Sequence, residues 1–243
     1  MEVARVSVLV LETAELVAEE AARQIARAAR RAVGQRGRFS LALAGGTTPR
    51  RAYELLAETP DVPWGAIDFY FGDERAVPLD DPESNFRMAR LALFDRQSIE
   101  EARIHRMRGD ADDLAEAARS YESELPGAFD LVLLGMGEDG HTASLFPGSP
   151  ALAERTRQVV PVTGPKPPPR RLSLTPLALE RAREVLVLVT GLAKADALAR
   201  ALGGPLDATS LPVQVVRDRA FVVDRAAASK LPEHLAQTES DSQ

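Results

Sequence analysis

Cysteine is absent from the 243-residue sequence, which excludes disulfide bonds and thiolate metal sites. The sequence also has no apolar run that approaches the ~18 residues of a membrane-spanning helix. The first twenty residues lack a basic leader and a small-residue cleavage site, so we interpret them as a strand and a helix and not as a signal peptide. We therefore expect a cytoplasmic protein that does not interact with membranes.

Positive charge is scarce, because the formal net charge is -6 and only three lysines accompany 27 arginines. This balance argues against a nucleic-acid-binding surface but leaves room for a local basic pocket that binds a small anion. No spacing among the three histidines resembles that of a metal site. We therefore expect neither a nucleic-acid partner nor a bound metal.

Apolar runs of strand length alternate along the chain with amphipathic segments. Most of these runs are nearly continuous in valine, leucine and isoleucine, as in strands that are buried on both faces. The predicted strands are residues 6–11, 39–44, 67–71, 129–134, 159–162, 185–189, 213–216 and 220–223. The predicted helices are residues 14–33, 49–58, 85–93, 112–124, 176–181 and 193–202. This alternation predicts an α/β fold with a doubly wound, mostly parallel sheet and helices on both faces.

Length and the 45% hydrophobic content suit one α/β domain, which we assign to residues 1–231, with a small additional lobe. Residues 232–243 are polar and are predicted to form a C-terminal tail. Residues 164–169, Gly-Pro-Lys-Pro-Pro-Pro, are predicted to be extended and to lead the chain toward Arg170 and Arg171.

A Gly-x-Gly-x-x-Gly pattern at residues 135–140 follows one predicted strand and matches the dinucleotide-binding fingerprint. That fingerprint needs a long helix after the third glycine, but Pro147 and Pro150 stop any helix within about two turns. Glu138 and Asp139 also place two carboxylates where a pyrophosphate would bind. The pattern therefore argues against NAD binding.

The same glycines allow a tight turn at the carboxyl end of a buried strand, and this turn carries His141. Ligands bind at that edge of open α/β sheets, so His141 is the first candidate for a catalytic residue. The alternative is a histidine that starts a helix and bonds to its backbone. Asp139 is interpreted as the N-cap of that short helix. His105, in an arginine-rich stretch, and His234, in the tail, are weaker candidates.

A second glycine-rich turn follows the strand predicted at residues 39–44. Gly45, Gly46 and Thr47 lie there, and Thr48 is the expected N-cap of the next helix. Exposed backbone N–H groups beside hydroxyls at a helix start can bind a phosphate or a sugar. A plain capped turn is the alternative.

Charged residues gather at two other strand ends. Asp73 and Arg75 lie in a Gly-Asp-Glu-Arg sequence, which a solvated loop also explains, and Asn85 starts the next helix, where a cap is the alternative. Lys194 falls in the first turn of a helix, where the macrodipole favours acids, so a bound anion would offset its placement. We therefore predict that Lys194 and Arg171 clamp a phosphate, the alternative being a solvated pair.

Four stretches together resemble the 6-phosphogluconolactonase branch of the glucosamine-6-phosphate isomerase/6-phosphogluconolactonase family. They are LALAGGTTPRRAYELLA, DFYFGDERAVPLDDPESNFRMA, FDLVLLGMGEDGHTASLFPG and PPPRRLSLTPLALERAREVLVLVTGLAKADAL, in the family's order, and they cover roughly residues 41–198. The resemblance implies a doubly wound sheet with a smaller lobe. It also implies hydrolysis of 6-phospho-D-glucono-1,5-lactone to 6-phospho-D-gluconate, in the oxidative pentose phosphate pathway, without metal or cofactor.

The resemblance also assigns roles to individual residues. It makes His141 the catalytic base, with Asp73 and Arg75 beside it in the active site. The residues that it implies for substrate binding are Gly45, Gly46, Thr47, Asn85, Arg171 and Lys194. Arg170 is the alternative to Arg171, which we prefer because it directly precedes Leu-Ser-Leu, where the family has arginine before an Ile-Thr-Leu-like run.

Two other functions remain open beside the lactonase. Glucosamine-6-phosphate deaminases share the fold, but their histidine loop continues toward Asn-Glu-Pro, whereas Phe146 precedes Pro147 here, which argues against deamination. A non-catalytic sugar-phosphate sensor is disfavoured by the presence of His141. No serine lies in a Gly-x-Ser-x-Gly elbow, which argues against a serine esterase. We expect a monomer whose partner is a small sugar-phosphate lactone.

Overall fold

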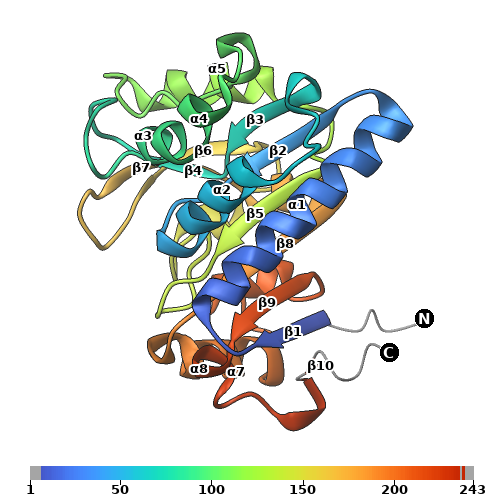
Figure 1. Cartoon of the computed structure of the whole chain (residues 1–243). Coiled ribbons are helices and arrows are strands. Elements are labelled where there is room, and N and C mark those ends of the chain that lie inside the picture. Colours follow the sequence, from blue (N-terminus) through green and yellow to red (C-terminus); the bar gives the residue numbers. More distant parts are fainter. Residues whose placement is uncertain (1–6, 236, 239–243) are drawn as a thin grey trace.

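The computed structural model describes residues 7–235 and 237–238, which form two sheets (Figure 1). The large sheet has seven parallel strands in the order β10-β1-β9-β8-β5-β2-β3. Their bounds are β1 Ser7–Leu11, β2 Phe39–Leu43, β3 Ile67–Phe71, β5 Leu131–Gly135, β8 Glu184–Val189, β9 Ala220–Asp224 and β10 Gln237–Thr238. The predicted doubly wound, mostly parallel sheet is confirmed.

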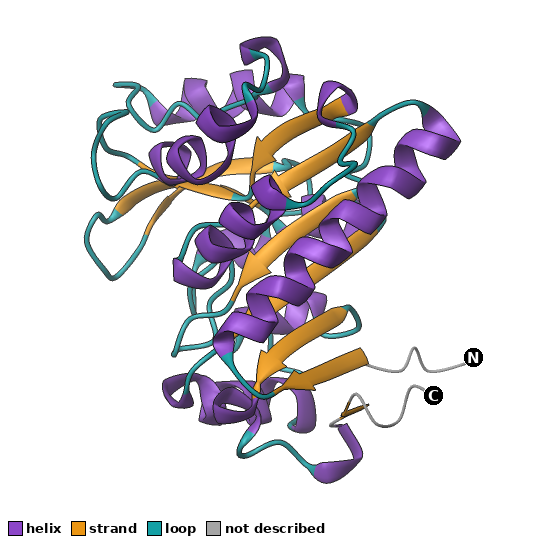
Figure 2. Ribbon diagram, viewed as in Figure 1, coloured by secondary structure: helices purple, strands orange, loops and turns teal. Residues whose placement is uncertain are grey.

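Helices cover both faces of this sheet (Figure 2), and α1 (Ala14–Arg36) lies against α2 (Thr47–Glu58) on one of them. The side chain of Thr13 caps α1 by accepting the N–H of Leu16, and Gly37 ends the helix with a φ of 74°. The other helices are α3 Asn85–Ala89, α4 Asp95–Gln97, α5 Leu114–Glu124, α6 Pro176–Arg181, α7 Ala195–Gly203 and α8 Arg225–Ala228. Among the described residues, no helix has the length and apolar content to cross a membrane.

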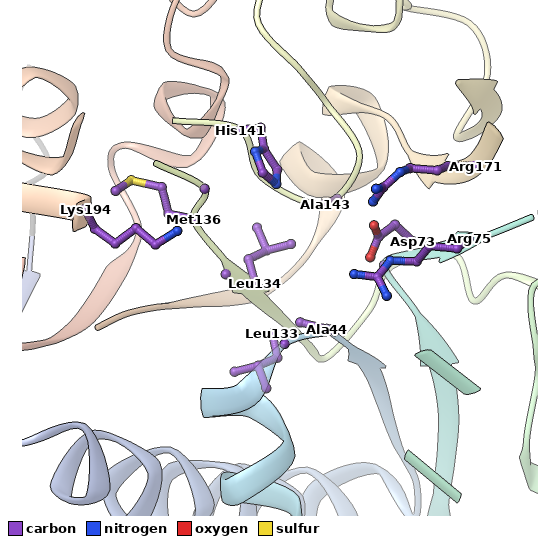
Figure 3. Close-up of a pocket in the computed structure, with 15 residues that line it drawn as sticks. Ala44, Asp73, Arg75, Leu133, Leu134, Met136, His141, Ala143, Arg171 and Lys194 are labelled. Carbon is purple, nitrogen blue, oxygen red and sulfur yellow. The ribbon is translucent and has the colours of Figure 1, made fainter. Parts of the chain in front are cut away.

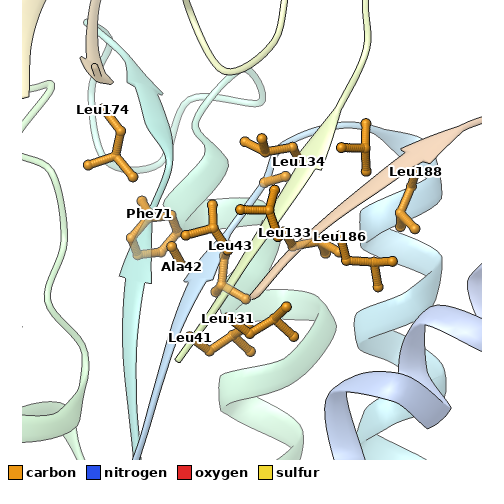
Figure 4. Packing of buried hydrophobic residues seen from close by; sticks show 14 of the residues in the cluster. Leu41, Ala42, Leu43, Phe71, Leu131, Leu133, Leu134, Leu174, Leu186 and Leu188 are labelled. Atoms are coloured by element: carbon orange, nitrogen blue, oxygen red, sulfur yellow. The ribbon is translucent and has the colours of Figure 1, made fainter. Parts of the chain in front are cut away.

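The centre of the large sheet is the core of the protein. Leucines of the neighbouring strands β2, β5 and β8 pack together there, among them Leu41, Leu131 and Leu186 (Figure 4). Burying one such side chain stabilises the fold by about 1.5–3 kcal/mol. This packing fixes the strands against one another and therefore fixes the loops that leave their carboxyl ends.

The strand order reverses between β2 and β5, because β2 leads to β3 on one side whereas β5, β8 and β9 follow one another on the other side. Ligands bind at such a switch point in open α/β sheets. The small additional lobe is a three-stranded antiparallel sheet of β4 (Asp73–Arg75), β7 (Arg170–Leu174) and β6 (Val159–Thr163). Only Gly72 separates β4 from β3, so the small sheet begins at the switch-point edge.

Some local predictions are wrong. The strand predicted at residues 213–216 is a 3₁₀ helix, Pro212–Val216, because a short apolar run does not distinguish strand from helix and proline suits a first helical turn. Residues 164–169 are not extended but form the bent tip of the β6–β7 hairpin, where the Gly164 N–H donates to the Pro169 carbonyl at 2.7 Å. Strands β4 and β7 were not predicted, since both begin with charged residues and pair over a long sequence separation.

The polar tail predicted at residues 232–243 contains a further strand. Glu233–Leu235 is a 3₁₀ turn, and β10 then pairs with β1, with Leu9 opposite Gln237. No apolar pattern in the sequence indicates this strand. Residues 1–6, 236 and 239–243, including the first residue of the strand predicted at 6–11, lie outside the described residues.

Candidate active site

A pocket of about 210 Å³ opens at the carboxyl edge of the large sheet, between the loops after β2 and β5 and the small sheet (Figure 3). That volume suits one small metabolite, because the pockets that hold drug-sized ligands measure about 300–1,000 Å³. Seven of the nine predicted site residues line it, namely Gly45, Gly46, Asp73, Arg75, His141, Arg171 and Lys194. The other two, Thr47 and Asn85, are not part of its lining.

The turn after β5 places His141 at the pocket. Gly140 has a φ of 79° and donates its N–H to the Gly137 carbonyl at 3.0 Å, while the Gly137 N–H donates to the His141 carbonyl at 2.8 Å. The chain then continues in turns and does not form a helix. The predicted N-cap role of Asp139 is therefore wrong. Its Oδ1 lies instead 2.5 Å from Nδ1 of His141.

Asp139 holds the His141 ring through its Nδ1 atom. Burial alone would raise the pKa of Asp139, but the hydrogen bond to His141 and the charge of that ring hold the pKa below its ordinary value. An ionised carboxylate accepts the Nδ1–H and leaves Nε2 as the proton acceptor. Gly137 makes this packing possible, since a Cβ there would lie 2.0 Å from His141 Nδ1.

Asp73 is buried and held by hydrogen bonds from two sides. Its Oδ2 accepts from Ser144 Oγ at 2.6 Å, and its Oδ1 accepts from Asn85 Nδ2 at 3.1 Å. Asn85 also lies against the turn after β2, because a Cβ on Gly45 would come within 2.1 Å of its Oδ1. Asn85 therefore supports the pocket wall from behind, and Gly45 leaves the space that it needs.

Two arginines of the small sheet face the pocket together. Arg75 on β4 is directly opposite Arg171 on β7, and the Asp73 side chain lies beside both (Figure 3). Burial, and then the charge of Arg75, lower the pKa of Arg171, while Asp73 opposes this change. Like charges directly opposite in a sheet are destabilising, and a bound anion would relieve the repulsion. Among the described residues, the buried Nε of Arg75 has no hydrogen-bond partner.

Arg170 turns away from this pocket, as neighbouring residues of a strand do. Its Nη2 donates to the Asp112 carbonyl at 3.4 Å, and it lines a different hollow on the small sheet. The pocket lining therefore includes Arg171 and Lys194 but not Arg170.

Lys194 reaches the pocket from the side opposite Arg75 and Arg171 (Figure 3). It ends the 3₁₀ turn Leu192–Lys194 that precedes α7. Burial lowers the pKa of Lys194, although the charge of Glu138 opposes this change. The pocket thus has cationic groups at two sides and an imidazole between them in the view of Figure 3.

Hydrogen bonds fix the loops on the Lys194 side. The Gly191 N–H donates to both carboxylate oxygens of Asp224 at 3.0 Å each. The predicted N-cap role of Thr48 is wrong, because α2 begins two residues earlier than predicted, at Thr47, with Gly46 at the cap. The Thr48 hydroxyl instead contacts that of Thr190 at 2.8 Å. These contacts join the turns after β2, β8 and β9.

Sequence reasoning gave Glu74 no role and offered a solvated loop as the alternative for its Gly-Asp-Glu-Arg stretch. The side chain is buried, and its carboxylate accepts the N–H groups of Arg75, Asn85 and Phe86, each at 2.8 Å, and the Ser84 hydroxyl at 3.1 Å. Burial raises the pKa of Glu74, while the backbone hydrogen bonds oppose this change. One signal in the sequence could have indicated this role. A helix was expected to start at Asn85, and the free N–H groups of its first turn need an acceptor, which Glu74 provides.

Comparison with known proteins gives consistent relatives along nearly the whole chain. The family model described as Glucosamine-6-phosphate isomerases/6-phosphogluconolactonase matches residues 12–224. The 6-phosphogluconolactonase of Mycobacterium tuberculosis is 41% identical, over 93% of this chain and 98% of its own length. That of Synechocystis sp. is 40% identical, over 83% of this chain and 88% of its own length.

Solved structures show the same likeness. The 6-phosphogluconolactonase from Trypanosoma cruzi matches with a TM-score of 0.82 and 30% identity, over 93% of this chain and 97% of that one. A monomeric glucosamine-6-phosphate deaminase matches with a TM-score of 0.80 and 26% identity, over 92% of this chain and 99% of that one. The chain therefore belongs to the glucosamine-6-phosphate isomerase/6-phosphogluconolactonase family.

Proposed function

We propose that this chain hydrolyses 6-phospho-D-glucono-1,5-lactone to 6-phospho-D-gluconate, the lactonase step of the oxidative pentose phosphate pathway, with His141 as general base. The observation that carries the proposal is the pair of His141 and Asp139, 2.5 Å apart, in a pocket that also holds arginine and lysine side chains. Relatives at about 40% identity that are named 6-phosphogluconolactonase support this substrate.

In the proposed reaction, Nε2 of His141 takes a proton from a water whose oxygen attacks C1 of the lactone. The bond between C1 and the ring oxygen then breaks, and the imidazolium returns the proton to the departing C5 oxygen. Asp139 stabilises the imidazolium while it exists. A positioned base of this kind contributes about 10²–10⁴-fold to the rate.

The oxyanion at C1 needs a hydrogen-bond donor or a cation aimed at it. Arg75 is the side-chain candidate, because its buried Nε has no partner among the described residues. The N–H groups of the glycine turns at the pocket wall are the backbone alternative. Asp73, with its carboxylate fixed by Ser144 and Asn85, is assigned to orienting a sugar hydroxyl.

Arg171 and Lys194 are assigned to the substrate phosphate, which they would approach from opposite sides of the pocket (Figure 3). Both line the pocket, and both are partly desolvated, which strengthens their attraction to an anion. Gly45 and Gly46 let the backbone approach the ligand. Thr47, which starts α2 beside that turn, and Asn85 are assigned to supporting it from outside the lining.

A deaminase is the second function to be tested, because a monomeric glucosamine-6-phosphate deaminase shares the fold. The position before Pro147 holds buried Phe146 here, so the loop carries no carboxylate at that point. We expect no ammonia from glucosamine 6-phosphate. Its release at a rate comparable with lactone opening would replace the lactonase proposal.

A direct test measures opening of freshly prepared phosphogluconolactone, corrected for spontaneous hydrolysis, after treatment with a chelator and without nucleotide. We expect acceleration under these conditions. Activity that disappears with the chelator and returns with a divalent metal would contradict the metal-free mechanism. The monomer and the cytoplasmic location remain predictions, and light scattering of the purified chain tests the first.

A further inference from the structure

Phe146 contacts two residues of the pocket lining, His141 and Arg171. Its ring is buried and lies 4.8 Å from the imidazole of His141, measured between ring centroids, with 40° between the planes. The guanidinium carbon of Arg171 lies 5.3 Å from the centroid of the same ring. One aromatic side chain therefore contacts both the proposed base and a proposed phosphate ligand.

The Phe146 ring is itself confined by the tip of the β6–β7 hairpin. A Cβ on Gly164 would lie 2.6 Å from Phe146 Cε2, so this backbone approaches the ring as closely as a glycine allows. The hairpin leads directly into Arg171, whose Nε donates to the Pro168 carbonyl at 3.0 Å. The ring and that carbonyl hold Arg171 at its place on the pocket wall.

His141 has two other constraints, which leave one side of its ring for Phe146. Asp139 fixes Nδ1, and Gly137 lies so close to the ring edge that no side chain fits between them. These contacts restrain one edge of the imidazole. Contact with Phe146 restrains the tilt of the ring and therefore the direction in which Nε2 points.

We propose that Phe146 is a positioning residue that fixes the His141 imidazole relative to the Arg171 guanidinium. This inference rests on the proposed roles of these two residues. The lactone carries its phosphate on C6 and reacts at C1, and its ring fixes the distance between them, so the base and the phosphate ligand must keep one separation. A misplacement of about 1 Å at a reacting group can cost 10²-fold in rate.

The test is Phe146→Leu, which keeps an apolar side chain but removes the ring. We expect kcat/KM for the phosphorylated lactone to fall about 10–30-fold, with kcat lowered and KM raised, because both contacts loosen. For unphosphorylated gluconolactone we expect only the loss in kcat. Inhibition by inorganic phosphate should weaken in parallel with the rise in KM.

A control variant and a double variant distinguish a positioning role of Phe146 from a general loss of packing. Phe129→Leu truncates a ring that is equally buried but packs edge-on against Tyr70, outside the pocket lining, and should leave kcat/KM unchanged. In an Arg171→Ala background, Phe146→Leu should no longer raise KM, because residues that act through a shared contact are non-additive. Fully additive effects would overturn the proposal.

Gly164→Ala tests the same ring without altering it, and is informative if Phe146→Leu fails to fold. The added methyl displaces Phe146 and should lower kcat/KM in the same direction by a smaller factor. A folded Phe146→Leu with kcat/KM within about two-fold of the wild type would overturn the inference. Weakened phosphate inhibition in Phe146→Leu supports the contact with Arg171 even if His141 proves not to be the base.

Discussion

The large parallel sheet and the small antiparallel sheet build opposite parts of the pocket by different means. The loops of the large sheet present His141 through a glycine turn with a φ of 79° at Gly140 and a close approach at Gly137. The small sheet presents Arg75 and Arg171 from paired strands, beside the buried acids Asp73 and Glu74. One side of the site depends on backbone shape and the other on hydrogen bonds between buried side chains.

This difference predicts different sensitivities. A glycine turn fails when a Cβ is added, because the clash is local and the strand below it stays packed. A network of buried polar groups fails when one partner is removed, because the donors left behind lose their hydrogen bonds. The variants below test the side chains that each side presents, from the largest expected effect to the smallest.

Replacing the proposed base should have the largest effect. His141→Asn keeps a similar volume and a hydrogen-bonding side chain but removes the base, so kcat should fall by about 10²-fold or more with substrate binding largely kept. Steady-state kinetics over the spontaneous background measure this. His105→Asn is the matched control, since His105 stacks on Tyr70 outside the pocket lining. A near-wild-type kcat in His141→Asn would show that His141 is not the base, and Asp73 would become the candidate.

Removing one proposed phosphate ligand should have the next largest effect. Arg171→Ala and Lys194→Ala should each lower kcat/KM for the phosphorylated lactone by about 30-fold, which corresponds to about 2 kcal/mol. Arg170→Ala is the control on the adjacent position, and it should change kcat/KM little because Arg170 lines another hollow. An effect of Arg170→Ala as large as that of Arg171→Ala would mean that overall charge, and not contact, is responsible.

Asp139→Asn keeps an oxygen for the Nδ1–H but removes the charge that stabilises the imidazolium. We expect kcat to fall about 10-fold. The pKa of Asp139 is held below its ordinary value, so its carboxylate stabilises the fold above the unfolded pKa of about 3.9 and loses this contribution as pH falls through the folded pKa. The difference in unfolding free energy between wild type and variant, from denaturant titrations, should therefore shrink below about pH 4. A difference that stays constant or grows as the pH falls below about 4 would contradict the pairing.

The smallest effect is expected on stability. Glu74→Gln leaves the buried N–H groups of Arg75, Asn85 and Phe86 with one acceptor oxygen in place of two. We expect a loss of about 1 kcal/mol in the free energy of unfolding. Glu116→Gln, at an exposed ion pair on α5, is the control and should change the stability by less than about 0.5 kcal/mol. Equal stabilities of the two variants would show that the Glu74 network contributes nothing.

The sequence predicted the large sheet well because its strands are continuous apolar runs, whose burial is a local property. The position of His141 at the pocket was predicted for a related reason, since glycines at the end of a strand indicate a tight turn. Asp139 was assigned wrongly, because whether a helix follows depends on contacts beyond the turn. Its pairing with His141 became visible only when both side chains were placed.

The small sheet was beyond local sequence reasoning. The register that brings Arg75 opposite Arg171 joins segments far apart in the chain, and no periodicity specifies it. Glu74 looked like a solvated residue because its burial depends on N–H groups of α3. Residues Pro212–Val216 form a 3₁₀ helix, but their short apolar run is equally typical of a strand. Only packing against the rest of the protein decides between the two structures.

The comparison of two lactones tests the proposed division of labour between His141 and Arg171 most directly. Rates of His141→Asn and Arg171→Ala are measured on phosphogluconolactone and on unphosphorylated gluconolactone, each corrected for spontaneous opening. The account predicts that His141→Asn loses the same factor on both substrates, whereas Arg171→Ala loses about 30-fold on the phosphorylated lactone and almost nothing on the other. Equal proportional losses of Arg171→Ala on both lactones would contradict it, because the arginine would then serve the fold or the chemistry and not the phosphate.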